Sequence, residues 1–182
     1  MNIEPYHVLL FIHFVSLITG FGAVIVIDTF GLLWILKKVK MSFVTQVANV
    51  TQRLIWLGYT GLVLTGIPLI LMKESISGLS TIKIFAVILV GLNGVYLHFI
   101  KKSMGEVSDD TKVSSLTKFR ITLATTISQV GWWTAIIIGF LNNKLKTSAP
   151  VIENPYNIIL PIVTLVLVVG VLGEIVFKKF DK

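Results

Sequence analysis

Eight polar or ionisable residues fall within, or at the ends of, long apolar stretches of the sequence. They are His13, Asp28, Arg53, Asn93, His98, Arg120, Gln129 and Glu174. An ionisable group costs at least about 2.5–3.5 kcal/mol to place in hydrocarbon, so such groups usually face the interior of a helix bundle and have partners. A neutral imidazole is the commonest metal ligand in proteins. The eight residues therefore suggest two kinds of chemistry, which are haem or metal ligation and the movement of protons or ions.

Five apolar stretches carry these residues, and each is near or above the roughly 20 residues that a membrane-spanning helix needs. They cover residues 6–36, 54–72, 82–100, 121–141 and 158–177. Of the 182 residues in the chain, 54% are hydrophobic and 14% are charged. A soluble domain carries roughly 25% charged residues, so this chain is too apolar to cover itself with a surface that water solvates. We predict an all-α fold, a bundle of five transmembrane helices that forms a single domain over residues 1–182.

The basic residues are divided unequally between the two sides of this bundle. Of 16 lysines and arginines, the side that holds the N-terminus has only Lys73, Lys83, Lys144 and Lys146. Basic residues in short loops stay in the cytoplasm, so we expect the N-terminus outside and the C-terminus inside. The net charge of +7 is then explained by loop lysines that meet anionic lipid, with no nucleic acid as partner. The expected partner is the bilayer, in the plasma membrane of a prokaryote.

Depth along the helices separates the polar residues into two groups. His13 lies in the outer third of the first helix, and Asp28 lies about 22 Å further toward the cytoplasm, at about 1.5 Å per residue. A cluster at similar depth near the cytoplasmic side is predicted to contain Asp28, Arg53, His98, Arg120 and Glu174. One reading of this cluster is a structural ion pair between Asp28 and Arg53 or Arg120. The other is a proton or cation relay that also uses His98 and Glu174.

Helical periodicity places several of these residues on shared faces. His13, Ser16, Gly20, Asp28 and Gly31 fall within one arc of about 120°, which we expect to pack against protein because small residues let helices approach closely. Two readings of His13 follow. Its ring either bonds a neighbouring helix, such as the stripe of Thr122, Thr125, Thr126 and Gln129, or it ligates haem or another metal.

The remaining small-residue faces lie on the third and fifth stretches. Gly91, Gly94 and His98 share a face of residues 82–100, with Asn93 about 140° away. Gly170 and Gly173 could serve a homo-oligomer as well as the internal bundle.

Three segments carry a resemblance to a known group of proteins. The first runs from His13 through Gly20-Phe21-Gly22 to Asp28, and the second from Lys83-Ile84-Phe85 through Asn93-Gly94 to Leu97-His98. The third is Ser128-Gln129-Val130-Gly131-Trp132-Trp133. Together they resemble the small integral membrane proteins that include the HemJ-type protoporphyrinogen oxidases and the copper-resistance D (CopD-like) domain.

The resemblance implies handling of b-type haem or copper, with His13 as the candidate ligand and His98 as a second cofactor-binding position. Two imidazoles on one iron lie roughly 4 Å apart, from metal–nitrogen distances near 2 Å each. The depth estimate puts His13 and His98 near opposite faces, so the two cannot share one iron unless the first helix is shifted by several turns, and five-coordinate haem b on His13 alone stays open. Three functions follow: a haem- or metal-handling membrane protein, a small proton or ion transporter that uses the cytoplasmic-side cluster, and a non-catalytic membrane subunit or scaffold.

Overall fold

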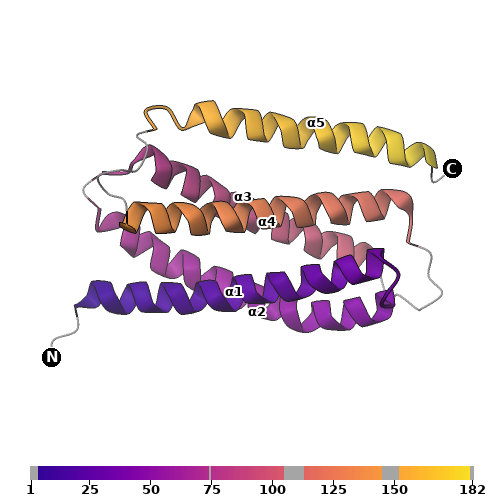
Figure 1. Cartoon of the computed structure of the whole chain (residues 1–182), viewed down its shortest axis with the longest axis horizontal. Coiled ribbons are helices and arrows are strands. Elements are labelled where there is room, and N and C mark those ends of the chain that lie inside the picture. Colours follow the sequence, from indigo (N-terminus) through magenta and orange to yellow (C-terminus); the bar gives the residue numbers. More distant parts are fainter. Residues whose placement is uncertain (1–3, 74, 105–112, 145–151, 181–182) are drawn as a thin grey trace. The chain divides into compact units, whose positions relative to one another are not determined.

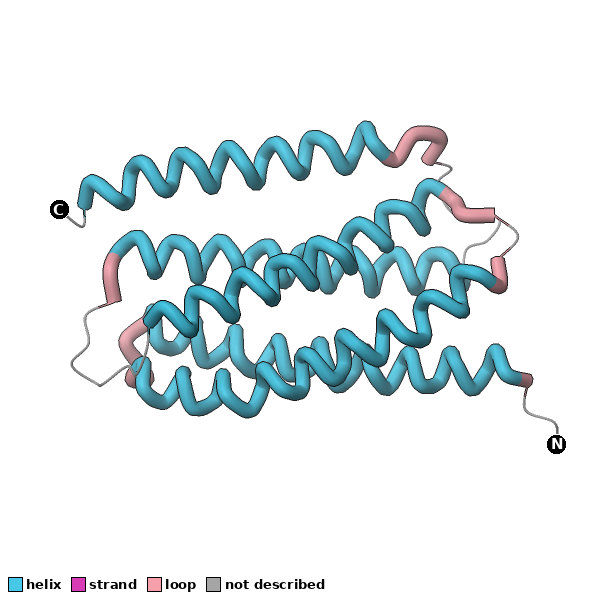
Figure 2. The backbone as a smooth tube through the Cα atoms, turned by 180° about the vertical axis from the view of Figure 1, so that it is seen from behind, coloured by secondary structure: helices cyan, strands magenta, loops and turns pink. Residues whose placement is uncertain are grey.

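The computed structural model describes residues 4–73, 75–104, 113–144 and 152–180. These ranges contain five α-helices and no strand. Figure 1 labels the helices, and Figure 2 colours them cyan. In chain order the helices are α1 (Pro5–Ile35), α2 (Met41–Leu71), α3 (Gly78–Met104), α4 (Ser115–Lys144) and α5 (Tyr156–Phe180). Each of the five is long and apolar enough to cross a membrane. The predicted all-α fold with five such helices is therefore confirmed.

The largest difference from the predicted boundaries is the start of α2, which begins at Met41 and not near residue 54. The first three turns of α2 are amphipathic, so a search for apolar stretches of roughly 20 residues does not include them. Their apolar side nevertheless packs: Val44 and Thr51 are buried, and the Phe43 ring lies edge-on to Phe30 of α1 with centroids 5.3 Å apart. Contact with α1 extends this helix beyond its most apolar part.

The helices group into two compact units, one containing α1 and α2 and the other α3, α4 and α5. In the first unit α1 and α2 form an antiparallel hairpin and lie side by side (Figure 1). Their backbones approach most closely where Gly58 faces Gly20, since a Cβ on Gly58 would lie 2.5 Å from Gly20 Cα and 2.6 Å from the Ser16 carbonyl oxygen. A methyl group does not fit there, so glycine is required at position 58.

The turn that joins α1 to α2 ends α1 in a Schellman motif. The Lys38 amide donates to the Leu33 carbonyl and the Lys37 amide donates to the Trp34 carbonyl, at 2.8 Å each. Lys37 has φ 59°, the left-handed conformation that glycine usually adopts at this position. Among the described residues it is the one non-glycine residue with positive φ. A lysine therefore occupies a position where its backbone is mildly strained.

In the second unit, α4 contacts both α3 and α5. Near the start of α3 a core of buried side chains joins the three helices, formed by Leu79, Ile82, Ile138 and Ile159. At the other end of the unit Phe119 of α4 stacks on Phe177 of α5, with centroids 5.0 Å apart, and the edge of its ring lies against Gly173. Gly173 therefore makes room for the aromatic side chain of a neighbouring helix.

Candidate functional site

His13 is the candidate ligand, and the structure places it on the face of α1 that packs against α2. Its side chain is half-buried, and Nδ1 lies 2.8 Å from the hydroxyl oxygen of Thr65, which is itself buried. Gly66 follows Thr65, and a Cβ there would meet the His13 ring at ordinary contact distance, 3.5 Å from Cε1. The predicted bond from His13 to a neighbouring helix therefore exists, and the helix is α2.

The hydroxyl of Thr65 determines which nitrogen of His13 carries a proton. Thr65 Oγ1 lies 2.6 Å from the Gly61 carbonyl oxygen, which can only accept, so the single hydroxyl proton is donated there. Toward His13 the same oxygen must accept, which makes Nδ1–H the donor. In the neutral imidazole the lone pair then resides on Nε2. This is the tautomer in which one ring nitrogen is fixed by the protein and the other can ligate a metal.

A stripe of small residues on α2 brings Thr65 to the histidine. Gly58, Gly61 and Thr65 fall within an arc of about 60° at about 100° per residue. They face Ser16 and Gly20 of α1, whose backbone and side chain occupy the space that a Cβ on either glycine would need. The predicted packing of the His13–Gly20 face is therefore seen in the hairpin. The α2 half of this contact is not among the predicted site residues, although its spacing could have revealed it.

Arg120 of α4 and Glu174 of α5 form a two-pronged ion pair. Arg120 Nε lies 2.5 Å from Glu174 Oε1, and Nη2 lies 2.6 Å from Oε2. The two side chains keep 38% and 39% of their surface exposed. The sequence places both residues in one polar cluster and suggests Asp28 as a partner for an arginine, whereas this arginine pairs with Glu174. In the hairpin, Asp28 is half-buried and Arg53 is exposed.

The other predicted polar residues lie on α3 and α4. Asn93 is buried, and its Nδ2 donates to the Ala124 carbonyl oxygen of α4 at 2.8 Å. The packed face of α3 is therefore the one that holds Asn93. His98, which the sequence places about 140° away, is exposed, and Gln129 on α4 is half-buried. The amide of Asn93 joins two helices.

The five long apolar helices are compatible with a multi-pass integral membrane protein. In the described ranges, no three His, Asp or Glu side chains lie close enough together to hold a metal ion between them. Comparison with known proteins found no matching family model, no matching curated protein and no matching solved structure.

Proposed function

We propose that this membrane protein handles b-type haem, which Nε2 of His13 would hold. The observation that supports this is the hydrogen-bond chain from His13 Nδ1–H to Thr65 Oγ1 and on to the Gly61 carbonyl. Histidines that ligate metals almost always donate their other ring N–H to a protein group, which fixes the tautomer and the ring orientation. The resemblance to haem- and copper-handling membrane proteins, carried by the segment from His13 to Asp28, points the same way.

His13 supplies the one ligand that such a group requires. A single protein ligand can hold a haem, so one imidazole would suffice. Gly66 beside the His13 ring leaves space that a larger side chain would fill. Bound haem would supply one-electron redox chemistry at its iron. The role of Thr65 is to hold the imidazole in one tautomer and one orientation.

The test is an absorption spectrum of protein purified in mild detergent after expression with ample haem, in the oxidised and the reduced state. We expect a Soret band that is lost in His13→Ala and kept in His7→Ala, since His7 is exposed in the first turn of α1. Thr65→Val keeps the shape of the side chain but removes the acceptor, and should weaken haem affinity by roughly 10–100-fold. A colourless wild-type protein, or a Soret band that His13→Ala retains, would contradict the proposal.

A scaffold function is the second candidate, favoured by a different observation. Three long-range polar contacts each join two helices: His13 with Thr65, Asn93 with the Ala124 carbonyl, and Arg120 with Glu174. Polar contacts of this kind stabilise helix packing without taking part in any reaction. The scaffold hypothesis predicts that proteoliposomes show no ion flux. Flux that Asp28→Asn abolishes would instead support transport through the cytoplasmic-side cluster.

A further inference from the structure

A groove runs along one side of the hairpin, between α1 and the first half of α2. Its volume is about 640 Å³, within the range of roughly 300–1,000 Å³ that is usual for ligand sites. Its lining includes Ile18, Gly22, Phe30, Phe43, Val50 and Leu54. The two hydroxyls in the lining, on Thr19 and Thr51, donate to carbonyls of their own helices, Val15 and Val47, at 2.9 Å each. The groove therefore presents an apolar surface.

The length of the groove matches one leaflet of a bilayer. From Ile18 to Phe30 the α1 wall rises about 18 Å, and from Phe43 to Leu54 the α2 wall rises about 16 Å, at about 1.5 Å per residue. One leaflet contributes about 15 Å, half of the roughly 30 Å hydrocarbon core. A single acyl chain that lies along the hairpin would occupy the groove from end to end.

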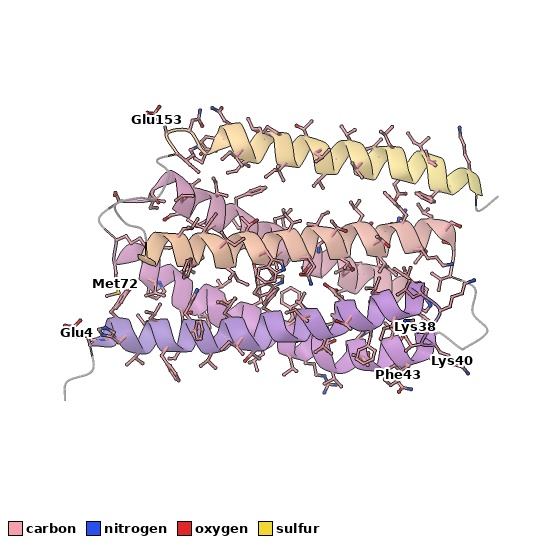
Figure 3. All side chains as sticks on the ribbon, in the orientation of Figure 1. Glu4, Lys38, Lys40, Phe43, Met72 and Glu153 are labelled. Carbon is pink, nitrogen blue, oxygen red and sulfur yellow. The ribbon has the colours of Figure 1, made fainter. Side chains whose placement is uncertain are left out.

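One end of the groove is close to a cluster of lysines. Lys38 and Lys40 lie at the same end of the hairpin as Phe43, and Glu4 and Met72 lie at the opposite end (Figure 3). Lys37 is in the same turn, and all three lysines are exposed. The sequence has no Asp or Glu between Asp28 and Glu74, so this part of the chain carries only positive formal charge. Basic residues beside a membrane attract anionic headgroups by about 1 kcal/mol each.

The conformation of Lys37 is an independent sign that charge matters at this end. Glycine would relieve the left-handed strain at φ 59°, yet a lysine occupies this position. Strain of this kind, at a residue that could be replaced at no steric cost, often marks a functional position. The ammonium group of Lys37 is the property that glycine would lose.

We infer that the hairpin binds one anionic phospholipid, with an acyl chain in the groove between Ile18 and Phe43 and the headgroup at Lys37, Lys38 and Lys40. The apolar lining, the leaflet-long walls and the basic turn each match one part of that lipid. The site does not involve His13, and it stands whether or not haem binds. On the predicted orientation the lysines face the cytoplasm, the side on which anionic lipids create a negative surface potential.

Two glycines of α1 provide a matched test of the groove. A Cβ on Gly22 or on Gly31 would meet nothing within 4 Å, but only Gly22 lines the groove. Nine residues separate them, which puts Gly31 about half a turn away around the helix. Delipidated full-length protein is titrated with phosphatidylglycerol or phosphatidylcholine, and the affinity for the first bound lipid is measured by native mass spectrometry.

We expect the wild-type protein to bind phosphatidylglycerol at least tenfold more tightly than phosphatidylcholine. Gly22→Leu should weaken phosphatidylglycerol binding at least fivefold, and Gly31→Leu should change it by less than twofold. Equal affinities for the two lipids in the wild type would overturn the proposal. The alternative occupant of the groove is a second copy of the chain. If the wild-type protein forms dimers, and Gly22→Leu abolishes them without changing the lipid affinity, the groove is a dimer contact and the proposal is overturned.

Lys37→Gly separates the headgroup contact from the integrity of the fold. Glycine relieves the left-handed strain, so the variant should unfold at a higher temperature than the wild type. Loss of one ammonium group should reduce the preference for phosphatidylglycerol about fivefold. A variant that is as stable as expected and keeps its full preference would overturn the assignment of the headgroup to this turn.

Discussion

The crossing of Gly58 with Gly20 leads to the sharpest prediction about stability, which is that Gly58→Ala forces the hairpin apart. A Cβ at position 58 would lie 2.5 Å from Gly20 Cα and 2.6 Å from the Ser16 carbonyl oxygen. Both atoms belong to backbone, so no side-chain rotation relieves the clash. Carbon atoms in contact settle about 3.5–4.0 Å apart, so α1 and α2 must separate there by roughly 1 Å.

The free-energy cost follows from two terms. Overpacking a well-packed contact typically costs about 1–3 kcal/mol. A separation of roughly 1 Å also lengthens the His13–Thr65 contact, now 2.8 Å, past the roughly 3.5 Å at which a hydrogen bond ceases to count. An interhelical hydrogen bond in a membrane protein contributes about 0.6 kcal/mol on average. We therefore expect Gly58→Ala to lower the free energy of unfolding by about 2–4 kcal/mol.

The assay is reversible unfolding in mixed micelles with increasing dodecyl sulfate, followed by far-ultraviolet circular dichroism. Gly31→Ala is the matched control, because a Cβ there would meet nothing within 4 Å and alanine favours the helix. That variant should be as stable as the wild type or slightly more so. Neutral substitutions usually change stability by less than about 0.5 kcal/mol. If the unfolding free energies of Gly58→Ala and Gly31→Ala agree within that margin, the close crossing of α1 and α2 is refuted.

Three further predictions concern the second unit. Gly173→Ala should destabilise it by less than Gly58→Ala destabilises the hairpin, because a Cβ there meets only the outer edge of the Phe119 ring; a larger loss in the same unfolding assay would contradict this. A double-mutant cycle with Arg120→Gln and Glu174→Gln should give a coupling energy on the order of 1 kcal/mol, given 38% and 39% exposure of the side chains, and strict additivity would show that the pair is energetically idle. Asn93→Ala should lower the unfolding free energy by about 0.6–1.7 kcal/mol, whereas Gln129→Ala, at a half-buried position, serves as the comparison and should cost less.

The helices could be predicted from the sequence because hydropathy alone determines which segments suit a bilayer. The residues from Pro5 to Ile35 are predominantly apolar, and the predicted and observed ends of this helix agree within one residue. The start of α2 could not be found in this way. Its first turns hold the buried Val44 and Thr51 and meet α1 where Phe43 contacts Phe30, and a scan for apolar stretches does not detect a contact between two helices.

The site was partly predictable for a related reason. Periodicity correctly grouped His13, Ser16 and Gly20 on one face of a helix, but a single helix does not reveal which neighbour covers that face. The pairing of Arg120 with Glu174 illustrates the same limit. The position of a residue along its helix gives its depth, and Arg120 and Glu174 were predicted at similar depth. It does not reveal which helices lie next to each other.

The short turn between Ile35 and Met41 has a consequence for biosynthesis. The helices α1 and α2 are consecutive in the sequence and pack against each other. The hairpin can therefore complete its packing once Leu71 has left the ribosome. Segments with local contacts fold quickly, and N-terminal units generally fold first during synthesis. The glycine crossing and the lysine turn would then be in place before α4 and α5 are translated. The first two helices can therefore enter the membrane as an assembled pair, ahead of the other three.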